Sequence, residues 1–121
     1  MTAEAAIHQF FNSCGIAAYP DLDVPRDAAL PYITYEQKTG CKGESAGLTV
    51  NVYYRDSSNT VINAKARELK AAILNGGMLE CDDSGVWLKP GSPWCQAVKD
   101  ESDPDIKRRY INVTAEFLTA E

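Results

Sequence analysis

The sequence predicts an α+β fold in a single domain over residues 1–121, with two main helices packed on one face of an antiparallel or mixed sheet of about four to six strands. Two segments repeat their apolar side chains at the period of an amphipathic helix, and several others alternate apolar and polar side chains as half-buried strands do. These segments follow one another in the order helix, strand, strand, helix and then several strands. A chain of 121 residues is long enough for one hydrophobic core but short for two independent domains.

The first half of the chain predicts a helix followed by a hairpin. Thr2 can cap a helix that Gly15 ends. The apolar face of this helix consists of Ala3, Ile7, Phe10, Phe11 and Cys14. Residues 19–31 contain three prolines and several charged side chains, so we interpret them as an ordered surface connection. Residues 32–37, which follow Pro31, and residues 48–55 alternate as strands, so they predict a hairpin with its long, glycine-bearing tip at 39–47.

The clearest helix lies in residues 57–77. Ser58 or Asn59 can cap its start, and the sequence Asn-Gly-Gly at 75–77 can end it. Its apolar stripe consists of Ile62, Ala66, Leu69 and Ile73. Its outer face, which we expect to be exposed to solvent, carries Lys65, Arg67 and Lys70.

The rest of the chain predicts strands. We expect two short strands in residues 78–90 around a turn at 82–85, a further strand in 92–100, and a long final strand in 105–121 after an acidic turn. In the final strand, the side expected to face the core carries Ile111, Val113, Ala115 and Phe117. The side expected to face away carries Tyr110, Asn112, Thr114 and Glu116. Arg108 and Arg109 are adjacent and should project to opposite faces, which argues against a continuous phosphate-binding stripe.

The composition excludes several classes of protein. Apolar residues make up 45% and charged residues 24%, which is ordinary for a soluble globular domain. The net charge of −5 argues against a dedicated duplex-binding protein, because such proteins carry a concentrated positive footprint. Basic side chains interleave with strand aromatics only at Arg55 and 107–109, so we favour core and interface roles for the aromatics over stacking on single strands. No apolar run is long enough for a membrane span, and no export signal is visible.

The sequence shows no constellation typical of catalysis or of a cofactor site. His8 is the only histidine, and the four cysteines, Cys14, Cys41, Cys81 and Cys95, are scattered without a CxxC pair. Glycine-rich phosphate loops and nucleophile motifs are lacking, and the acidic clusters fall in predicted turns. We therefore expect no enzyme activity, no cofactor and no metal. A small enzyme that uses His8 or a cysteine remains the alternative from another class.

Three stretches resemble the tail terminator, or tail-completion, family of phages and prophages of Gram-positive bacteria. They are "LPYITYE" at the first strand of the hairpin, "WLKPGSPWCQAVKD" in the middle and "IKRRYINVTAEFL" near the C-terminus, and the similarity extends from about residue 3 to about residue 118. The resemblance rests on Pro31, Tyr32, Thr34, Tyr35, Trp87, Pro93, Trp94, Arg108, Arg109 and Tyr110. It implies a structural protein that closes the head-proximal end of the tail tube as a ring, usually hexameric, and offers a surface for joining the head. The implied partners are further copies of this chain, the tail tube protein and a head-completion protein, and the implied location is the host cytoplasm during assembly and then the virion.

Ring formation makes the charged segments candidate subunit contacts. We expect the acidic turn, with Asp100 and Asp103, to face a basic surface on a neighbour, for which the helix face with Lys65, Arg67 and Lys70 is a candidate. Arg108 and Arg109, at the start of the final strand beside this turn, are further candidate subunit contacts. The polar side of the final strand, with Asn112, Thr114 and Glu116, is the candidate lining of the ring. DNA would pass through this hole without specific binding, so we expect the lining to be neutral to acidic. Other tail or head–tail connector components, and the terminator of a contractile bacteriocin, remain alternatives.

Overall fold

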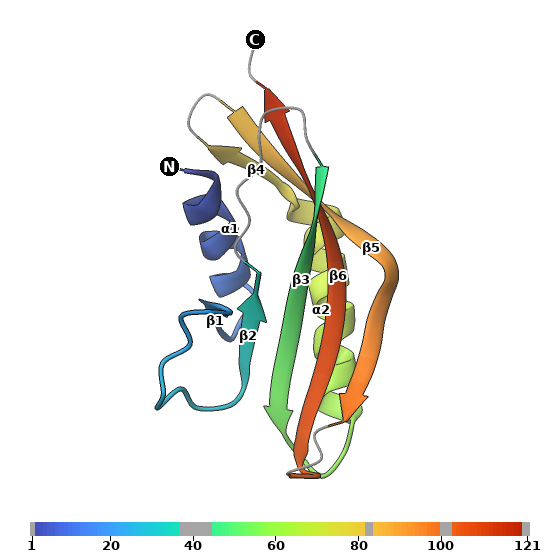
Figure 1. Ribbon diagram of the computed structural model, residues 1–121. Helices are drawn as coiled ribbons and strands as arrows, with labels where there is room; N and C mark the ends of the chain where they lie inside the picture. The colour runs from blue at the N-terminus through green and yellow to red at the C-terminus, as the bar shows by residue number, and fades with distance from the viewer. Residues whose placement is uncertain (1, 37–44, 82–83, 100–102, 120–121) are drawn as a thin grey trace.

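A computed structural model describes residues 2–36, 45–81, 84–99 and 103–119 (Figure 1). The predicted α+β class is confirmed, with two helices and a six-stranded sheet. Among the described residues the elements are, in chain order, α1 (Ala3–Asn12), β1 (Ala17–Pro20), β2 (Tyr32–Tyr35), β3 (Ser45–Arg55), α2 (Thr60–Gly76), β4 (Met78–Cys81), β5 (Ser84–Lys99) and β6 (Ile106–Thr119).

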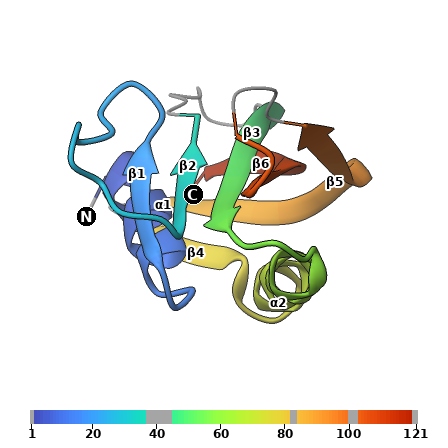
Figure 2. The same cartoon turned by 90° about the horizontal axis from the view of Figure 1, so that it is seen from below.

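The sheet is mixed, with the strand order β1-β2-β3-β6-β5-β4. Only β1 and β2 pair in parallel, and the other four pairings are antiparallel. The predicted hairpin is the pair β2–β3, and its expected tip at 39–47 lies mostly outside the described residues. The sheet curls so strongly that α1 contacts both edge strands, β1 and β4, while α2 covers β3, β6 and β5 (Figure 2). Both helices therefore lie on one face of the sheet, as predicted.

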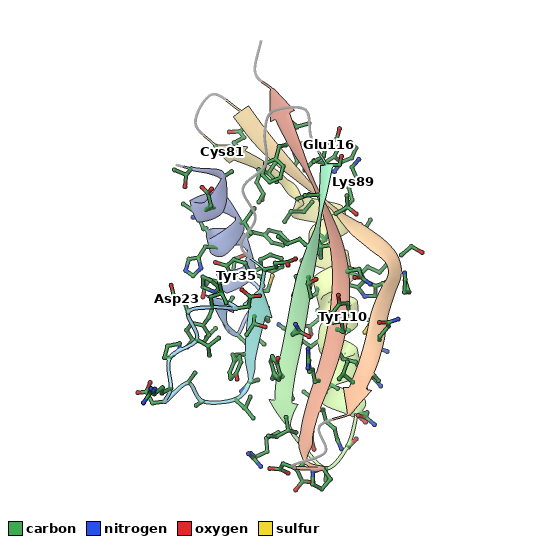
Figure 3. All side chains as sticks on the ribbon, in the orientation of Figure 1. Asp23, Tyr35, Cys81, Lys89, Tyr110 and Glu116 are labelled. Atoms are coloured by element: carbon green, nitrogen blue, oxygen red, sulfur yellow. The ribbon has the colours of Figure 1, made fainter. Side chains whose placement is uncertain are left out.

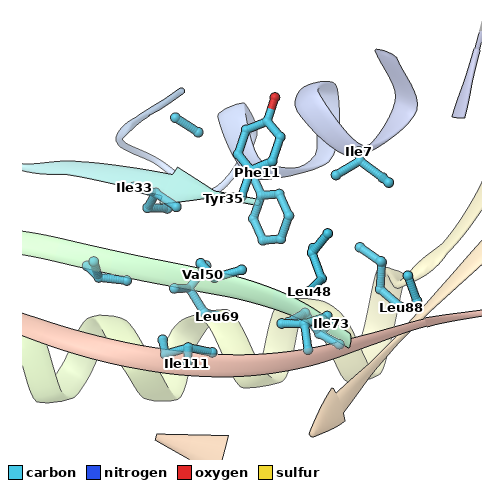
Figure 4. Close-up of a cluster of buried hydrophobic side chains, with 14 of the residues drawn as sticks. Ile7, Phe11, Ile33, Tyr35, Leu48, Val50, Leu69, Ile73, Leu88 and Ile111 are labelled. Carbon is cyan, nitrogen blue, oxygen red and sulfur yellow. The ribbon is translucent and has the colours of Figure 1, made fainter. Parts of the chain in front are cut away.

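The hydrophobic core fills the space between this face and the two helices (Figure 4). Each helix contributes the apolar stripe that its sequence predicts, with Ile7 and Phe11 from α1 and Ile62, Ala66, Leu69 and Ile73 from α2. The strands contribute mainly alternate residues, which include Ile33, Tyr35, Leu48, Val50, Val52, Val86, Leu88, Ile111, Val113, Ala115 and Phe117. The ring of Phe11 stacks on that of Tyr35 at 5.3 Å between centroids, which fixes α1 over β2. The predicted core side of the final strand is confirmed.

The start of the expected surface connection is instead a strand. β1 includes Tyr19 and Pro20, and it pairs with β2 from Ala17↔Tyr32 to Pro20↔Tyr35. Its outer edge is covered by the side chain of Asn12, whose Oδ1 accepts from the Ala18 N–H at 3.2 Å and whose Nδ2 donates to the Ala18 carbonyl at 3.3 Å. A side-chain amide thus occupies the place of a neighbouring strand and protects this edge from further pairing.

The two strands expected at the end of 78–90 and in 92–100 are one long strand, β5, with an irregular register between Pro90 and Cys95. Gly91 lies at this irregularity so close to β6 that a Cβ atom on it would stand 2.8 Å from the backbone oxygen of Asn112. The Asn112 side chain also donates to the Pro93 carbonyl at 2.7 Å. The prolines and the glycine therefore bend one strand and do not separate two.

Lys65 does not lie on the solvent side of α2, which corrects the prediction for that face. Lys65 is only 7% exposed, and its Nζ donates to the backbone carbonyl of Cys14, just after α1, and to Glu68 Oε2 at 3.3 Å. Lys65 follows Ile62 by three residues and precedes Leu69 by four, so helical geometry places it beside the apolar stripe. Arg67 and Lys70 are exposed, as expected.

Candidate functional site

The face of the sheet that carries no helix presents a row of aromatic rings across three adjacent strands. The Tyr19 and Tyr32 rings meet edge to face at 6.0 Å between centroids, and the Tyr32 and Tyr53 rings lie 5.2 Å apart. The row ends at Arg108 on β6, whose guanidinium carbon lies 5.7 Å from the centre of the Tyr53 ring. Burial, followed by the nearby Tyr53 and Tyr19, raises the pKa of Tyr32 above its ordinary value of 10.0.

A second row on the same face is held by hydrogen bonds. Arg108 Nε donates to Asn51 Oδ1 at 2.9 Å, and the hydroxyls of Thr49 and Tyr110 are 3.2 Å apart. The register places Asn51 opposite Tyr110 and Thr49 opposite Asn112. These contacts give the polar side chains of β3 and β6 fixed positions on the surface.

The far end of the face carries an ion pair beside an exposed aromatic ring. Lys89 Nζ and Glu116 Oε2 are 2.7 Å apart, and the two side chains lie together where β5 and β6 pair (Figure 3). The same ammonium lies 4.0 Å from the centre of the Trp87 ring. Trp87 faces Met78 on the edge strand β4, and both side chains are exposed. This end of the face therefore combines a neutralised charge pair with apolar surface.

Two cations of the helix-free face are paired with carboxylates of the same chain, and a third is held by uncharged groups. Arg55, at the end of β3, pairs with Asp103 Oδ2 at 2.7 Å, Lys89 pairs with Glu116, and Arg108 is held by an amide oxygen and an aromatic ring. This side therefore has no stripe of free cations among the described residues. The charges of Arg55 and Lys89 are therefore compensated locally, and Arg108 keeps its positive charge beside the Tyr53 ring.

The structure places all three candidate lining residues, Asn112, Thr114 and Glu116, on this helix-free face of β6 and leaves them half-exposed. The alternation of β6 predicts their orientation. It does not predict the tyrosine row on the same face, because the row needs the neighbour order β1-β2-β3-β6, which joins segments far apart in the sequence.

The candidate contact residues do not form one patch. Arg108 and Arg109 project to opposite faces, as predicted, but Arg109 is only 8% exposed, and it donates to Asn63 Oδ1 at 2.9 Å and to Asn59 Oδ1 at 3.2 Å. Arg109 is thus bound to α2 of its own chain, and Lys65 is likewise buried. Asp103 pairs with Arg55, and Asp100 lies outside the described residues. Arg67 and Lys70 are the remaining exposed cations of the expected basic surface.

The residues considered for catalysis have structural partners. His8 Nδ1 is 2.7 Å from the hydroxyl of Tyr35, and Asn12 lies beside the same ring. Burial raises the pKa of the Cys14 and Cys95 thiols, which keeps them protonated at neutral pH. In the described part of the chain, no three His, Cys, Asp or Glu side chains are grouped so that they could hold a metal ion. No helix in the same residues combines the length and the apolar character needed to cross a bilayer.

A comparison with solved structures finds the fold in another protein. A chain from the virion of the native gene transfer agent particle superposes with a TM-score of 0.68 and covers 94% of this chain and 92% of that chain. The two chains share one fold. Their sequences are 17% identical, so the likeness is one of backbone architecture. No family model matches this sequence, and no curated protein does.

Proposed function

We propose that this chain is a structural protein of a phage-like virion, which closes the head-proximal end of a tail tube as a hexameric ring. The observation that carries the proposal is the fold shared with a chain of a gene transfer agent virion, over 94% of the length. The resemblance of three sequence stretches to tail terminators points to the same assembly role. A shared fold alone does not determine function, so the surface chemistry must agree as well.

The helix-free face suits the lining of such a ring. It is polar and aromatic, it is rigidly hydrogen-bonded, and its cations are engaged by partners of the same chain. DNA that must slide through a hole needs a surface without free basic stripes, because each phosphate contact to a cation slows its passage. Asn112, Thr114 and Glu116 on β6 would face this hole, and the tyrosine row lies further along the same face, level with Arg108.

In this role the chain acts through contacts and not through a reaction. One rim of the ring would end polymerisation of the tail tube protein, and the other would receive a head-completion protein. The ring would assemble in the host cytoplasm, with no membrane and no cofactor involved, and would remain in the mature virion.

Removal of the chain tests this role directly. Particles assembled without it should have tubes of irregular, excessive length that carry no heads, and the purified chain added back should cap those tubes. Native mass spectrometry of the protein, free or released from tube tips, should give six copies. Tails of normal length joined to heads in the absence of the chain would contradict the role.

A second candidate is a subunit of the tail tube or of the head–tail connector, since the fold shared with a virion chain fits these positions too. Labelling of the chain in purified particles separates the candidates. A tube subunit gives label along the whole tail, and a connector gives label inside the head vertex. A terminator gives one site at the junction of tail and head.

A further inference from the structure

We infer that neighbouring subunits of the ring contact each other through two different surfaces, an acidic loop of one copy and the solvent side of α2 of the next. The acidic loop is residues 21–31, between β1 and β2, and the helix surface consists of Arg67, Lys70, Ala71 and Leu74. This inference rests on the proposed ring and identifies the contact that would close it.

The acidic loop presents an apolar side chain between two carboxylates. Leu22 is 94% exposed, although it is a large apolar residue, and it stands between Asp21 and Asp23. The loop carries Asp21, Asp23 and Asp27 against Arg26, a net charge of three negative minus one positive, or −2. Within the described residues, the side chains of Asp21 and Asp23 take part in no hydrogen bond or ion pair.

The backbone of the acidic loop is nevertheless well anchored. The Asp21 N–H donates to the Tyr35 carbonyl at 2.9 Å, which extends the pairing of β1 with β2. The Asp23 N–H donates to the Pro20 carbonyl at 2.9 Å, and the Ala28 N–H to the Pro25 carbonyl at 3.1 Å. Leu22 is therefore exposed on an ordered turn. Because the turn is already ordered, the loop loses less conformational entropy when it binds a partner.

The solvent side of α2 has the complementary chemistry. Arg67, Lys70, Ala71 and Leu74 follow one another at helical spacing, so they form a single stripe, and Leu74 is 65% exposed. Arg67 and Lys70 form no ion pair within the described residues, whereas the nearby Glu68 bonds to Lys65. The stripe therefore joins an apolar end to two free cations, which match Leu22 and its two flanking carboxylates.

The placement of the two surfaces fits a closed ring. In Figure 2 the acidic loop and α2 lie at opposite corners of the molecule, so one copy does not bring them together. A contact between two different surfaces is heterologous, and repeated contacts of this kind close into a ring when the rotation permits. The acidic loop is a better match for this stripe than the turn at Asp103, because that carboxylate already pairs with Arg55 of its own chain.

Charge reversal on each side tests the contact. A loop variant carries Asp21→Lys and Asp23→Lys, and a helix variant carries Arg67→Glu and Lys70→Glu. Either variant alone should lose the ring, as like charges then meet at every interface. Mixed in equal amounts, they should form rings that alternate, with three copies of each, because every interface is then either wild-type or fully reversed. Native mass spectrometry, or capped tube ends in electron micrographs, measures the outcome.

The control variant carries Glu80→Lys and Asp105→Lys, two exposed positions outside both surfaces that give the same change in charge as the loop variant. It should assemble like the wild type. Leu22→Asn should weaken assembly by about tenfold or more, since its side chain buries apolar area only at the contact. Circular dichroism of each variant should match the wild type, because none of these side chains is buried in the monomer.

Three results would overturn the inferred contact and leave the proposed function standing. They are rings formed by either reversed variant alone, a mixture that stays unassembled while the control assembles, and loss of the ring in the control. Failure of the wild-type chain itself to form rings or to cap tubes is a different result, because it contradicts the proposed function.

Discussion

Arg109 on β6 and Asn63 on α2 are joined by two hydrogen bonds, from Nη2 at 2.9 Å and from Nε at 3.2 Å to the same amide oxygen. A second amide, Asn59, accepts from Nη2, and the Arg108 carbonyl accepts from Nη1. One guanidinium thus fixes the first turn of α2 to the sheet. The usual side-chain cap is absent at Asn59, since no capping bond forms there and its amide oxygen turns to Arg109.

Arg109→Leu should lower the free energy of unfolding by about 2–3 kcal/mol, because it leaves two amides without their buried, charged donor. Urea denaturation measures the change. Arg67→Leu is the control, because this arginine is exposed on α2 and holds no other element of the chain, and it should lower the value by under about 0.5 kcal/mol. Equal losses in both variants would mean that Arg109 has no special role in holding α2.

Lys65→Met should loosen α1 more than it loosens the sheet. The variant keeps the apolar stem and removes the ammonium that donates to the Cys14 carbonyl. We expect a loss of about 1–2 kcal/mol and faster amide exchange over residues 3–16. Lys70→Met, at an exposed position of the same helix, should change neither quantity. Unchanged exchange in α1 of the Lys65 variant would contradict the link between the two helices.

Gly91→Ala should lower stability by about 1–3 kcal/mol, because the new methyl group would stand 2.8 Å from both Cβ and the backbone oxygen of Asn112. Thermal unfolding reports the loss. Gly47→Ala on β3 is the control, since beyond its own residue and its two chain neighbours nothing lies within 4 Å of the added carbon. A Gly91→Ala variant that is as stable as the wild type would show that β5 does not need this close approach to β6.

Stability should fall in alkaline solution. Burial raises the pKa of Tyr35 above its ordinary 10.0, so the folded chain favours the neutral phenol and the unfolded chain ionises first. The contribution of this group is therefore complete below about pH 10 and is lost as the pH rises through the raised pKa. Urea midpoints between about pH 8 and about pH 11 should fall less steeply for Tyr35→Phe than for the wild type. A parallel fall in both would contradict the assignment.

The fold class can be predicted because it depends on local periodicity. The stripe of α2 and the alternation of β6 identify the core-facing side chains without any knowledge of partners. β1 cannot be predicted in this way, because Ala17–Pro20 is short and pairs only with β2, across a connection whose prolines are typical of a plain loop. The wrong prediction that β5 is two strands has the same cause, because it takes proline and glycine to mark the end of a strand.

The candidate site can be predicted only in part. The face of β6 to which Asn112 belongs follows from alternation, and so does the inward direction of Arg109. The burial of Arg109 cannot be predicted from alternation, because its amide partners lie 46 to 50 residues earlier in the chain, at the start of α2. The spacing of Lys65 to Ile62 and Leu69 predicts that it lies beside the buried stripe of α2. Its charge, however, favours the prediction of a solvent-exposed position.

The length of tail tubes in particles assembled without this chain is the decisive observation for the terminator role. Electron micrographs should show tubes with a broad, extended length distribution and free heads, and addition of the purified chain should restore capped tubes that join heads. Tubes of normal, uniform length that are joined to heads without the chain would contradict that role.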